Sequence, residues 1–436
     1  MRDTRLARVL RDRPRPVCDA PMDAAGGRRD PAGEDLGARF ERTWAQLAPI
    51  GRDPGTGGYR RYAWAAADLQ LRDWFADRAA ERGMTCETDR NGNLWAWWGE
   101  PADGAVVTGS HLDSVPDGGA FDGPLGVVSA FLAVDELRSR GVAPRRPLAV
   151  VAFADEEGAR FGVACAGSRL LTGALEPERA RGLRDADGVD LAEAMRAAGA
   201  DPAAIGRDAE ALRRIGAFVE LHVEQGRALV DLDSPVGIST AIWPHGRWRC
   251  RFEGAADHAG TTRLTDRRDP VLPFASTVLA ARELADLAGA LATVGRVHVR
   301  PNGTNAVASG VDSWLDARAP DEETLARLVA DVTAAAETAA AAQGTTVEVT
   351  RESWSPEVSF DAELRARIDG VLGGVPALPT GAGHDAGILS VHVPTAMLFV
   401  RNPTGVSHSP AEHAEPDDCV AGVRALAAVL EDLACR

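Results

Sequence analysis

Residues 106–128 read VVTGSHLDSVPDGGAFDGPLGVV, and this stretch decides the fold. It opens with two valines that are typical of a buried strand, and from Pro124 to Leu137 it is typical of a helix. Between them lies a polar segment rich in glycine, which lets the chain turn tightly. A strand, a polar loop and a helix in this order predict an α/β sheet with its chemistry at the carboxyl end of the strand.

Three side chains in this stretch can carry chemistry. His111 and Asp113 are two residues apart, so on an extended segment they lie on the same side. Asp122 follows among the glycines. Taken alone, the stretch is also compatible with a polar turn that carries incidental charges. The rest of the chain decides between these interpretations.

The bulk composition limits the class of protein. The 436 residues are enough for two domains and a large core, and 45% of them are hydrophobic. The net charge of −16 argues against nucleic-acid binding, because phosphate contacts need a basic face. All 48 basic residues counted as lysine or arginine are arginine. Mechanisms that use a lysine Schiff base or a lysine nucleophile are therefore excluded.

Cysteine usage and hydropathy indicate the compartment. The six cysteines are scattered without a CxxC pair, so neither a disulfide framework nor a thiolate zinc site is expected. The sequence has no apolar run long enough for a membrane span. Residues 1–34 are rich in Arg, Asp, Pro and Gly without periodicity. We expect a disordered leader or an overextended start of the reading frame there, rather than a secretory signal. We expect a cytoplasmic protein.

Two further strand ends carry polar side chains. The apolar run Leu148–Phe153 predicts a buried parallel strand, and Glu156 and Glu157 follow it closely. Phe218–His222 predicts a third strand, followed by Gln225. Two glutamates beside a buried strand are costly to bury unpaired, so they need a metal or a cationic partner.

From residue 241 the pattern changes. Residues 241–355 predict strand, helix, strand, strand, helix, strand, which is the split βαβ arrangement. We interpret this segment as a second domain inserted into the first, which then comprises residues 35–240 and 356–436. The returning chain predicts a helix at 362–372, a glycine-rich loop at 380–387, a strand at 395–400 and a final helix at 416–433.

The histidines and carboxylates indicate a metal centre. Three of the nine histidines follow predicted strands together with several acids, and no clustered cysteine accompanies them. Imidazole and carboxylate ligands suit Zn, Mn or Ni, and a bridging carboxylate suits two metals about 3.5–4 Å apart. Asp113 is placed to orient His111. Of the two adjacent glutamates, one can bind metal while the other accepts a proton from water. A single histidine of this kind would more often be structural, and only the joint pattern favours a metal site.

Seven motifs now carry a family resemblance. They are GSHLDSVPDGGAFDGPLGV, DEEGARFG, HVEQG, DHAGTT, RPNGTNAVASG, GAGHDAG and GVSHSPAEH. The chain resembles the M20 metallopeptidase-like amidohydrolases over about residues 40–435. More narrowly, it is similar to the branch that contains allantoate amidohydrolase, N-carbamoyl-L-amino-acid hydrolase and β-ureidopropionase. The resemblance implies an α/β catalytic domain with a mostly parallel, zinc-peptidase-like sheet and two divalent metal ions. It also implies an inserted ferredoxin-like α+β domain that serves as lid and dimer interface.

The resemblance implies a role for each motif residue. It makes His111 and His222 ligands of one metal, Glu157 and His408 ligands of the other, and Asp122 the bridge between them. Glu156 becomes the general base, and His258 in the inserted domain polarises the scissile carbonyl or stabilises the oxyanion. The implied substrate contacts are Gln225, Asn305 and Arg318; His384 and Asp385 lie in a pocket loop with their roles open. Gln225 is also compatible with a capping amide, and Arg318 with a surface arginine.

The implied reaction is hydrolysis of a non-peptide C–N bond, the carbamoyl bond of a ureido acid. Our first choice of substrate is allantoate, as in purine-ureide catabolism, and the alternative is an N-carbamoyl-L-amino acid or β-ureidopropionate. An aminoacylase or dipeptidase is a further class, and HVEQG and RPNGTN argue against it. A binding module without activity is a third, and the intact Glu156 argues against that. One departure from the family pattern is Arg263-Leu264, where many relatives have Pro-Met after DHAGTT.

Overall fold

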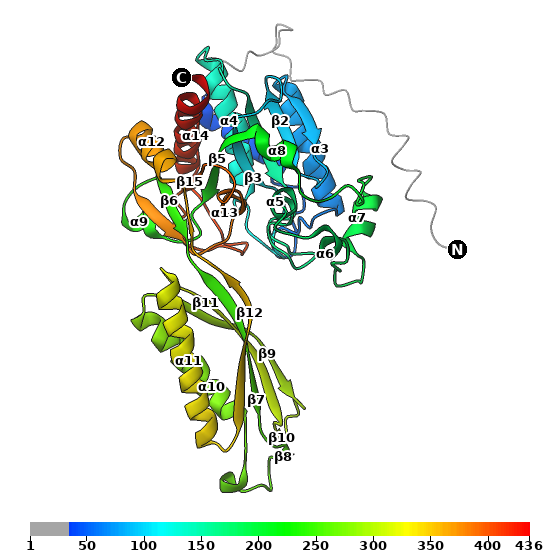
Figure 1. Cartoon of the computed structure of the whole chain (residues 1–436), viewed down its shortest axis with the longest axis vertical. Coiled ribbons are helices and arrows are strands. Elements are labelled where there is room, and N and C mark those ends of the chain that lie inside the picture. Colours follow the sequence, from blue (N-terminus) through cyan, green and yellow to red (C-terminus); the bar gives the residue numbers. More distant parts are fainter. Residues whose placement is uncertain (1–34) are drawn as a thin grey trace, which may run out of the picture.

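The computed structural model describes residues 35–436, so the expected leader at 1–34 lies outside the described residues. The chain forms two lobes, one built on a nine-stranded sheet and the other on a four-stranded sheet (Figure 1). A two-stranded ribbon extends the second lobe at its far end (Figure 1).

The nine-stranded sheet has a parallel centre. Its order is β1-β2-β4-β3-β5-β15-β6-β13, with β14 beside β6. The neighbours β4, β3, β5 and β15 run parallel, and the edges add antiparallel strands. The bounds are β1 Thr85–Thr88, β2 Leu94–Trp98, β3 Ala105–His111, β4 Leu148–Phe153, β5 Ile215–Val223, β6 Val236–Ile242, β13 Val358–Ser359, β14 Ala377–Thr380 and β15 Thr395–Val400. This is the mostly parallel α/β sheet that the sequence predicts.

Helices cover both faces of this sheet, which explains why its central strands are buried on both faces and mostly apolar. Val106 of β3 packs into one layer and its neighbour Val107 into the other. The first layer contains α2 (Leu36–Leu47), α3 (Ala66–Glu81), α4 (Pro124–Ser139), α12 (Ala362–Leu372) and α14 (Pro416–Leu430), which a π-helical turn, Glu431–Cys435, extends. The second layer contains α5 (Ala166–Thr172), α8 (Ala209–Arg214) and α13 (Asp385–Leu389).

Some elements differ from the sequence-based expectation. The sequence does not predict the short helices α5, α6 (Pro177–Arg181), α7 (Leu191–Ala197), α8 and α9 (Ala228–Asp231). Each has seven residues or fewer, which is too short for a periodic apolar pattern. Strand β3 also runs on to His111, so this histidine ends a strand rather than standing in the loop.

The four-stranded sheet has the predicted split βαβ connectivity. The chain order is β7 (His245–Glu253), α10 (Val271–Leu287), β9 (Leu291–Arg300), β11 (Gly310–Arg318), α11 (Glu322–Ala342) and β12 (Thr346–Ser355). The sheet order is β12-β7-β11-β9, with every pair antiparallel. Trp248 and Leu315 pack with Leu325 of α11 in the core of this lobe.

The small ribbon lies at the end of this lobe farthest from the first sheet. It pairs β8 (Asp257–His258) with β10 (Ala306–Val307), and a 3-10 turn, Leu264–Asp266, follows β8 (Figure 1). The chain passes between the lobes at two places, from β6 to β7 and from β12 to β13.

Within residues 35–436, no helix has both the length and the apolar character that a membrane crossing needs. The five cysteines in this part of the chain are free thiols.

Candidate metal centre

The candidate site forms where three neighbouring parallel strands end. His111 is the last residue of β3, the Glu156–Glu157 pair follows β4, and His222 lies one residue before the end of β5. Since the sheet order is β4-β3-β5, these side chains meet at one edge. Gly123 makes room for them, because its φ is +86° and a Cβ there would lie 2.4 Å from the His111 ring.

The carboxylate of Asp122 lies at the centre of the cluster. Its Oδ1 is 3.2 Å from Nε2 of His222 and 3.5 Å from Nε2 of His111. Its Oδ2 is 3.3 Å from Nε2 of His408. One oxygen therefore faces two imidazoles and the other faces the third, as expected of a carboxylate shared between two ligand groups.

The donor atoms fit divalent cations. Among the groups with ligand atoms close enough to hold an ion, two share Asp122, and they are His111–Asp122–His222 and Asp122–Glu157–His408. Nε2 of His222 and Oε1 of Glu157 are buried without a hydrogen-bond partner among the described residues, which is costly unless a cation meets them. Imidazole and carboxylate donors suit Zn, Mn or Ni.

The electrostatics of the cluster point the same way. Burial disfavours the charge on Asp122, yet the nearby imidazoles of His111 and His222 hold the pKa of its carboxyl well below the usual range. Burial and the charge of Asp122 raise the pKa of Glu157 to about 7. The hydrogen bond to Asp122 raises the pKa of His408 to about 9. Without a metal ion, Glu157 and His408 therefore tend to keep protons at the positions where cations would bind.

Glu156 lies at the rim of this cluster. Its Oε2 is 3.9 Å from Nε2 of His111, and burial raises the pKa of its carboxyl well above the usual value. The carboxylate of Asp113 accepts hydrogen bonds from the backbone N–H groups of Glu156 at 3.1 Å and Glu157 at 3.0 Å. Oδ1 of Asp113 is also 3.5 Å from Nδ1 of His111. Asp113 therefore supports both glutamates as well as the histidine.

Gln225 contacts the central carboxylate. Its Nε2 donates to Oδ2 of Asp122 at 2.9 Å and to Oγ of Ser407 at 3.1 Å. Its Oε1 is buried without a hydrogen-bond partner in residues 35–436. The structure thus places Gln225 beside Asp122, with one acceptor atom left over.

Two buried glutamates that the sequence interpretation did not single out support the site. Oε1 of Glu412 accepts hydrogen bonds from the backbone N–H groups of Phe121 and Asp122. Glu220 accepts one from Oγ of Ser110 at 2.7 Å. Glu220 had a signal, since an acid two residues before His222 in an apolar strand lies on the same face as that histidine. Glu412 lies in the motif GVSHSPAEH, and nothing in the sequence around it indicates that it contacts the backbone of Phe121 and Asp122.

His384 and Asp385 lie behind the cluster. The ring of His384 is 4.6 Å from that of His222, and burial and the nearby His222 keep the pKa of His384 well below its usual value. Asp385 accepts a hydrogen bond from Oγ of Ser168. His384 also forms a third possible ligand group with Glu220 and His222, which shares His222 with the first.

Three predicted site residues lie in the second lobe. His258 and Asn305 are exposed neighbours at its far end, where the backbone N–H of Ala259 donates to the carbonyl of Asn305 (Figure 1). Arg318 lies at the opposite end of β11 and donates to the carbonyl of Gly381 in the first lobe. The nine residues of β11 place the two ends of this strand about 27 Å apart.

Within a single chain, Asn305 and Arg318 are therefore too far apart to contact the same carboxylate group. That each of them contacts the substrate stays a prediction. Asn305 precedes β11 and Arg318 is its last residue, and a strand places its two ends far apart. The same geometry keeps His258 away from the candidate metal centre in the described chain (Figure 1).

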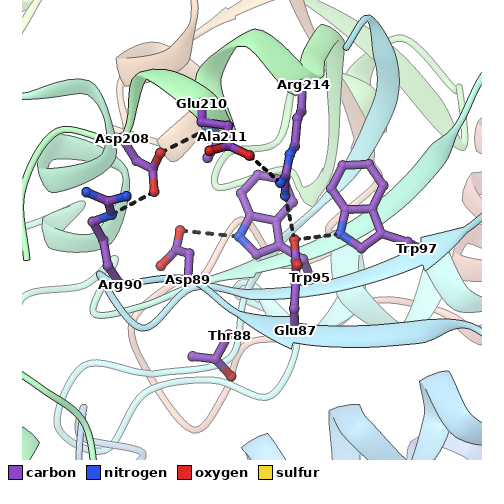
Figure 2. Close-up of a pocket in the computed structure, with 10 residues that line it drawn as sticks. All are labelled: Glu87, Thr88, Asp89, Arg90, Trp95, Trp97, Asp208, Glu210, Ala211 and Arg214. Atoms are coloured by element: carbon purple, nitrogen blue, oxygen red, sulfur yellow. Dashed lines mark hydrogen bonds and ion pairs between the residues drawn. The ribbon is translucent and has the colours of Figure 1, made fainter. Parts of the chain in front are cut away.

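A hollow of about 250 Å³ lies away from the cluster, between the β1–β2 hairpin and α8 (Figure 2). Trp95 and Trp97 line it, and their indole N–H groups donate to Asp89 and Glu87. Arg214 pairs with Glu87 and Arg90 with Asp208 (Figure 2). Glu87, Asp89 and Asp208 in this hollow thus already have hydrogen-bond or ion-pair partners. None of the predicted site residues lines it.

Comparison with known proteins identifies the family. Residues 107–432 match the model of peptidase family M20/M25/M40. An N-carbamoyl-L-amino acid amidohydrolase of Geobacillus stearothermophilus is 39% identical over 88% of this chain and 96% of its own length. The allantoate amidohydrolase of Escherichia coli K12 is 34% identical over 91% and 97%. A hydantoinase/carbamoylase family amidase from Burkholderia multivorans superposes with a TM-score of 0.82 at 31% identity, over 92% of this chain and 98% of that one. The chain therefore belongs to peptidase family M20/M25/M40, as a hydrolase of C–N bonds.

Proposed function

We propose that this protein hydrolyses the carbamoyl C–N bond of a ureido acid with the help of two divalent metal ions. The observation that carries the proposal is the position of Asp122 between two ligand groups, with Glu156 at their rim. The relatives that are named for allantoate and N-carbamoyl amino acids support the ureido class.

The two ligand groups would hold one ion each and share Asp122. Bound there, divalent cations would acidify a water molecule and polarise the substrate carbonyl. Asp113 fixes the backbone of both glutamates, and Gln225 and Glu412 fix Asp122. These contacts keep the ligand set in one arrangement, which is what such sites need for affinity.

Glu156 would act as general base and then as general acid. It removes a proton from the attacking water, because its Oε2 faces the cluster. It then returns the proton to the departing nitrogen, and the carbamate that leaves decomposes to ammonia and carbon dioxide. One water molecule balances the reaction.

Arg318 would bind the carboxylate of the substrate. It lies at the end of β11 nearest the first lobe and touches the loop of Gly381, which leads to the buried His384. Its planar guanidinium can meet a carboxylate with two parallel hydrogen bonds.

We propose that His258 and Asn305 reach the site of a second copy of the chain in a homodimer. The exposed leucines on α10 and the free edge of β9 support an interface on this lobe, since such apolar groups favour burial. The exposed apolar side chains there are Leu272, Leu279, Leu287, Leu291 and Val297. Closure of the lobe over its own site is the alternative route for His258.

The sequence-based choice of substrate is allantoate. An N-carbamoyl-L-amino acid is the second candidate, and the 39% identity to the relative named for it, against 34% for the allantoate relative, favours it. Both substrates offer a ureido group to the metals and a carboxylate to Arg318.

The first test is ammonia release by protein loaded with Zn²⁺, Mn²⁺ or Ni²⁺ and offered both substrates in parallel, with Glu156→Gln as the matched control. Turnover of allantoate alone would assign that substrate, and turnover of carbamoyl amino acids would assign the second. Metal-loaded protein that is silent on both would overturn the ureido proposal, and acylated amino acids and dipeptides would be tested next.

Mixing two inactive variants tests the dimer. Glu156→Gln and His258→Ala damage different parts of the site, so a mixed dimer has one intact site if His258 acts across the interface. Activity should reappear on mixing after subunit exchange. Continued inactivity in proven mixed dimers would show that His258 acts within its own chain.

A further inference from the structure

A buried thiol contacts the residue that we assign as general base. Sγ of Cys165 donates a hydrogen bond to Oε1 of Glu156 at 3.1 Å. The two residues are 3% and 6% exposed, so water does not compete for this contact. When Glu156 is ionised, as a general base must be, this hydrogen bond has a charged acceptor and is stronger than one between neutral groups.

The backbone around Cys165 is fastened to the same segment. The N–H of Cys165 donates to the carbonyl of Glu156 at 2.5 Å, and the N–H of Ala166 donates to that of Asp155 at 3.0 Å. Gly167 continues the pattern with the carbonyl of Ala154 at 2.8 Å. The start of α5 is thus locked to the segment that follows β4, and the thiol has little freedom to leave Glu156.

The two oxygens of Glu156 have different surroundings. Oε1 faces Cys165, while Oε2 faces the metal cluster, 3.9 Å from Nε2 of His111. The last torsion of a glutamate is broad and roughly two-fold, so it needs an external contact to define it. Among the hydrogen bonds to the side chain of Glu156, the one from Cys165 supplies that contact.

We propose that Cys165 is a positioning residue, whose thiol holds one oxygen of Glu156 so that the other faces the attacking water. The inference rests on the proposed role of Glu156 as base, but not on the ureido substrate. Burial and the charge of Glu156 raise the pKa of the Cys165 thiol, which keeps its proton available for donation.

The test compares Cys165→Ala with Cys165→Ser, which keeps a donor of similar size. Cys419→Ala is the matched control, because Cys419 is a fully buried thiol on α14. Rates are measured on whichever ureido acid, acylated amino acid or dipeptide the wild type hydrolyses. Cys165→Ala should lower kcat by about three- to tenfold, the value of one such hydrogen bond, with KM unchanged. Cys165→Ser should stay close to wild type.

Equal kcat values for wild type and Cys165→Ala would overturn the proposal. So would an equal loss in Cys165→Ser, or in Cys419→Ala, because either would indicate packing rather than donation. A wild type that hydrolyses only peptides would refute the ureido proposal and leave this comparison valid.

Infrared spectroscopy of the S–H stretch provides a readout without turnover. The band of Cys165 is obtained by subtracting the spectrum of Cys165→Ala from that of wild type. It should lie at lower frequency than the band of Cys419, which is obtained in the same way from Cys419→Ala. In Glu156→Gln it should move to higher frequency, because an amide is a weaker acceptor. A band that does not respond to Glu156→Gln would overturn the contact, even if Cys165→Ala were too unstable for kinetics.

Discussion

Oε1 of Glu412 accepts a hydrogen bond from the backbone N–H of Asp122 at 3.0 Å. The two residues are 290 positions apart in the sequence, so the loop before α14 closes over the loop before α4. The same oxygen also accepts from the N–H of Phe121 at 2.8 Å. The backbone that carries the central carboxylate is therefore held by a side chain that does not belong to either ligand group.

Replacing this support should weaken metal binding. Glu412→Ala removes the acceptor for two backbone N–H groups, and we expect the affinity for divalent metal to fall by about 10- to 100-fold. Competition with a chromophoric chelator measures it. Glu178→Ala, at an exposed glutamate on α6, is the control and should bind like wild type. Unchanged affinity in Glu412→Ala would contradict this role.

The metal-free protein should lose stability as the pH rises. The pKa of Glu157 is about 7 and that of His408 about 9, both above the ordinary values of 4.5 and 6.5. Groups whose pKa is raised by folding stabilise most fully below their ordinary values, and this stabilisation is lost as the pH passes the folded values. We expect the Tm of chelated protein to fall between about pH 4.5 and pH 9.

Divalent cations must displace these same protons. Metal affinity should therefore rise over the same range, by about tenfold per pH unit for each proton released. Calorimetry of metal binding in two buffers of different ionisation enthalpy counts the protons. His408→Gln should release fewer of them than wild type. A Tm and an affinity that do not change with pH would refute the assignment.

Glu156→Gln should separate binding from chemistry. The amide cannot accept the proton of the attacking water, so kcat should fall by about 10²- to 10⁴-fold. The two ligand groups do not include Glu156, so the metal content should be that of wild type. Atomic absorption after dialysis measures the metal, and ammonia release measures the rate. Loss of metal together with activity would instead assign Glu156 as a ligand.

Arg318 should act mainly on substrate binding. Arg318→Ala removes the proposed partner of the substrate carboxylate, so KM should rise by at least about tenfold, since hydrogen bonds to charged groups are worth about 1.5–3 kcal/mol. Arg318→Lys should recover part of this loss, because it keeps the charge but not the planar fork. Initial rates over a range of substrate concentrations test both. Arg247→Ala, at the exposed guanidinium on β7, is the control.

The sequence predicts the central architecture because the relevant signals are local. Apolar runs such as Leu148–Phe153 mark the buried strands, and they coincide with β4 and β15 to the residue. The order of elements in residues 245–355 is also predictable, because each helix there is long enough to show periodicity. The short helices between β4 and β5 lack such a pattern and were missed.

The residues of the site are likewise predictable only where their signal in the sequence is local. The histidines and acids at strand ends are visible in the sequence, because a parallel sheet gathers its strand ends at one edge. The supporting contacts of Glu412 and Cys165 depend on loops that meet only after folding. The positions of His258 and Asn305 depend on how far β11 separates its two ends, and the motifs do not encode that distance.

Asp113 links the two ligand groups mechanically. Its carboxylate holds the backbone of Glu157, which belongs to one group, and touches His111, which belongs to the other. An ion that orders one group therefore prepares the second through a shared anchor. The two ions should load cooperatively, with the half-loaded species scarcely populated during a titration, and Asp113→Asn should make the two binding steps independent.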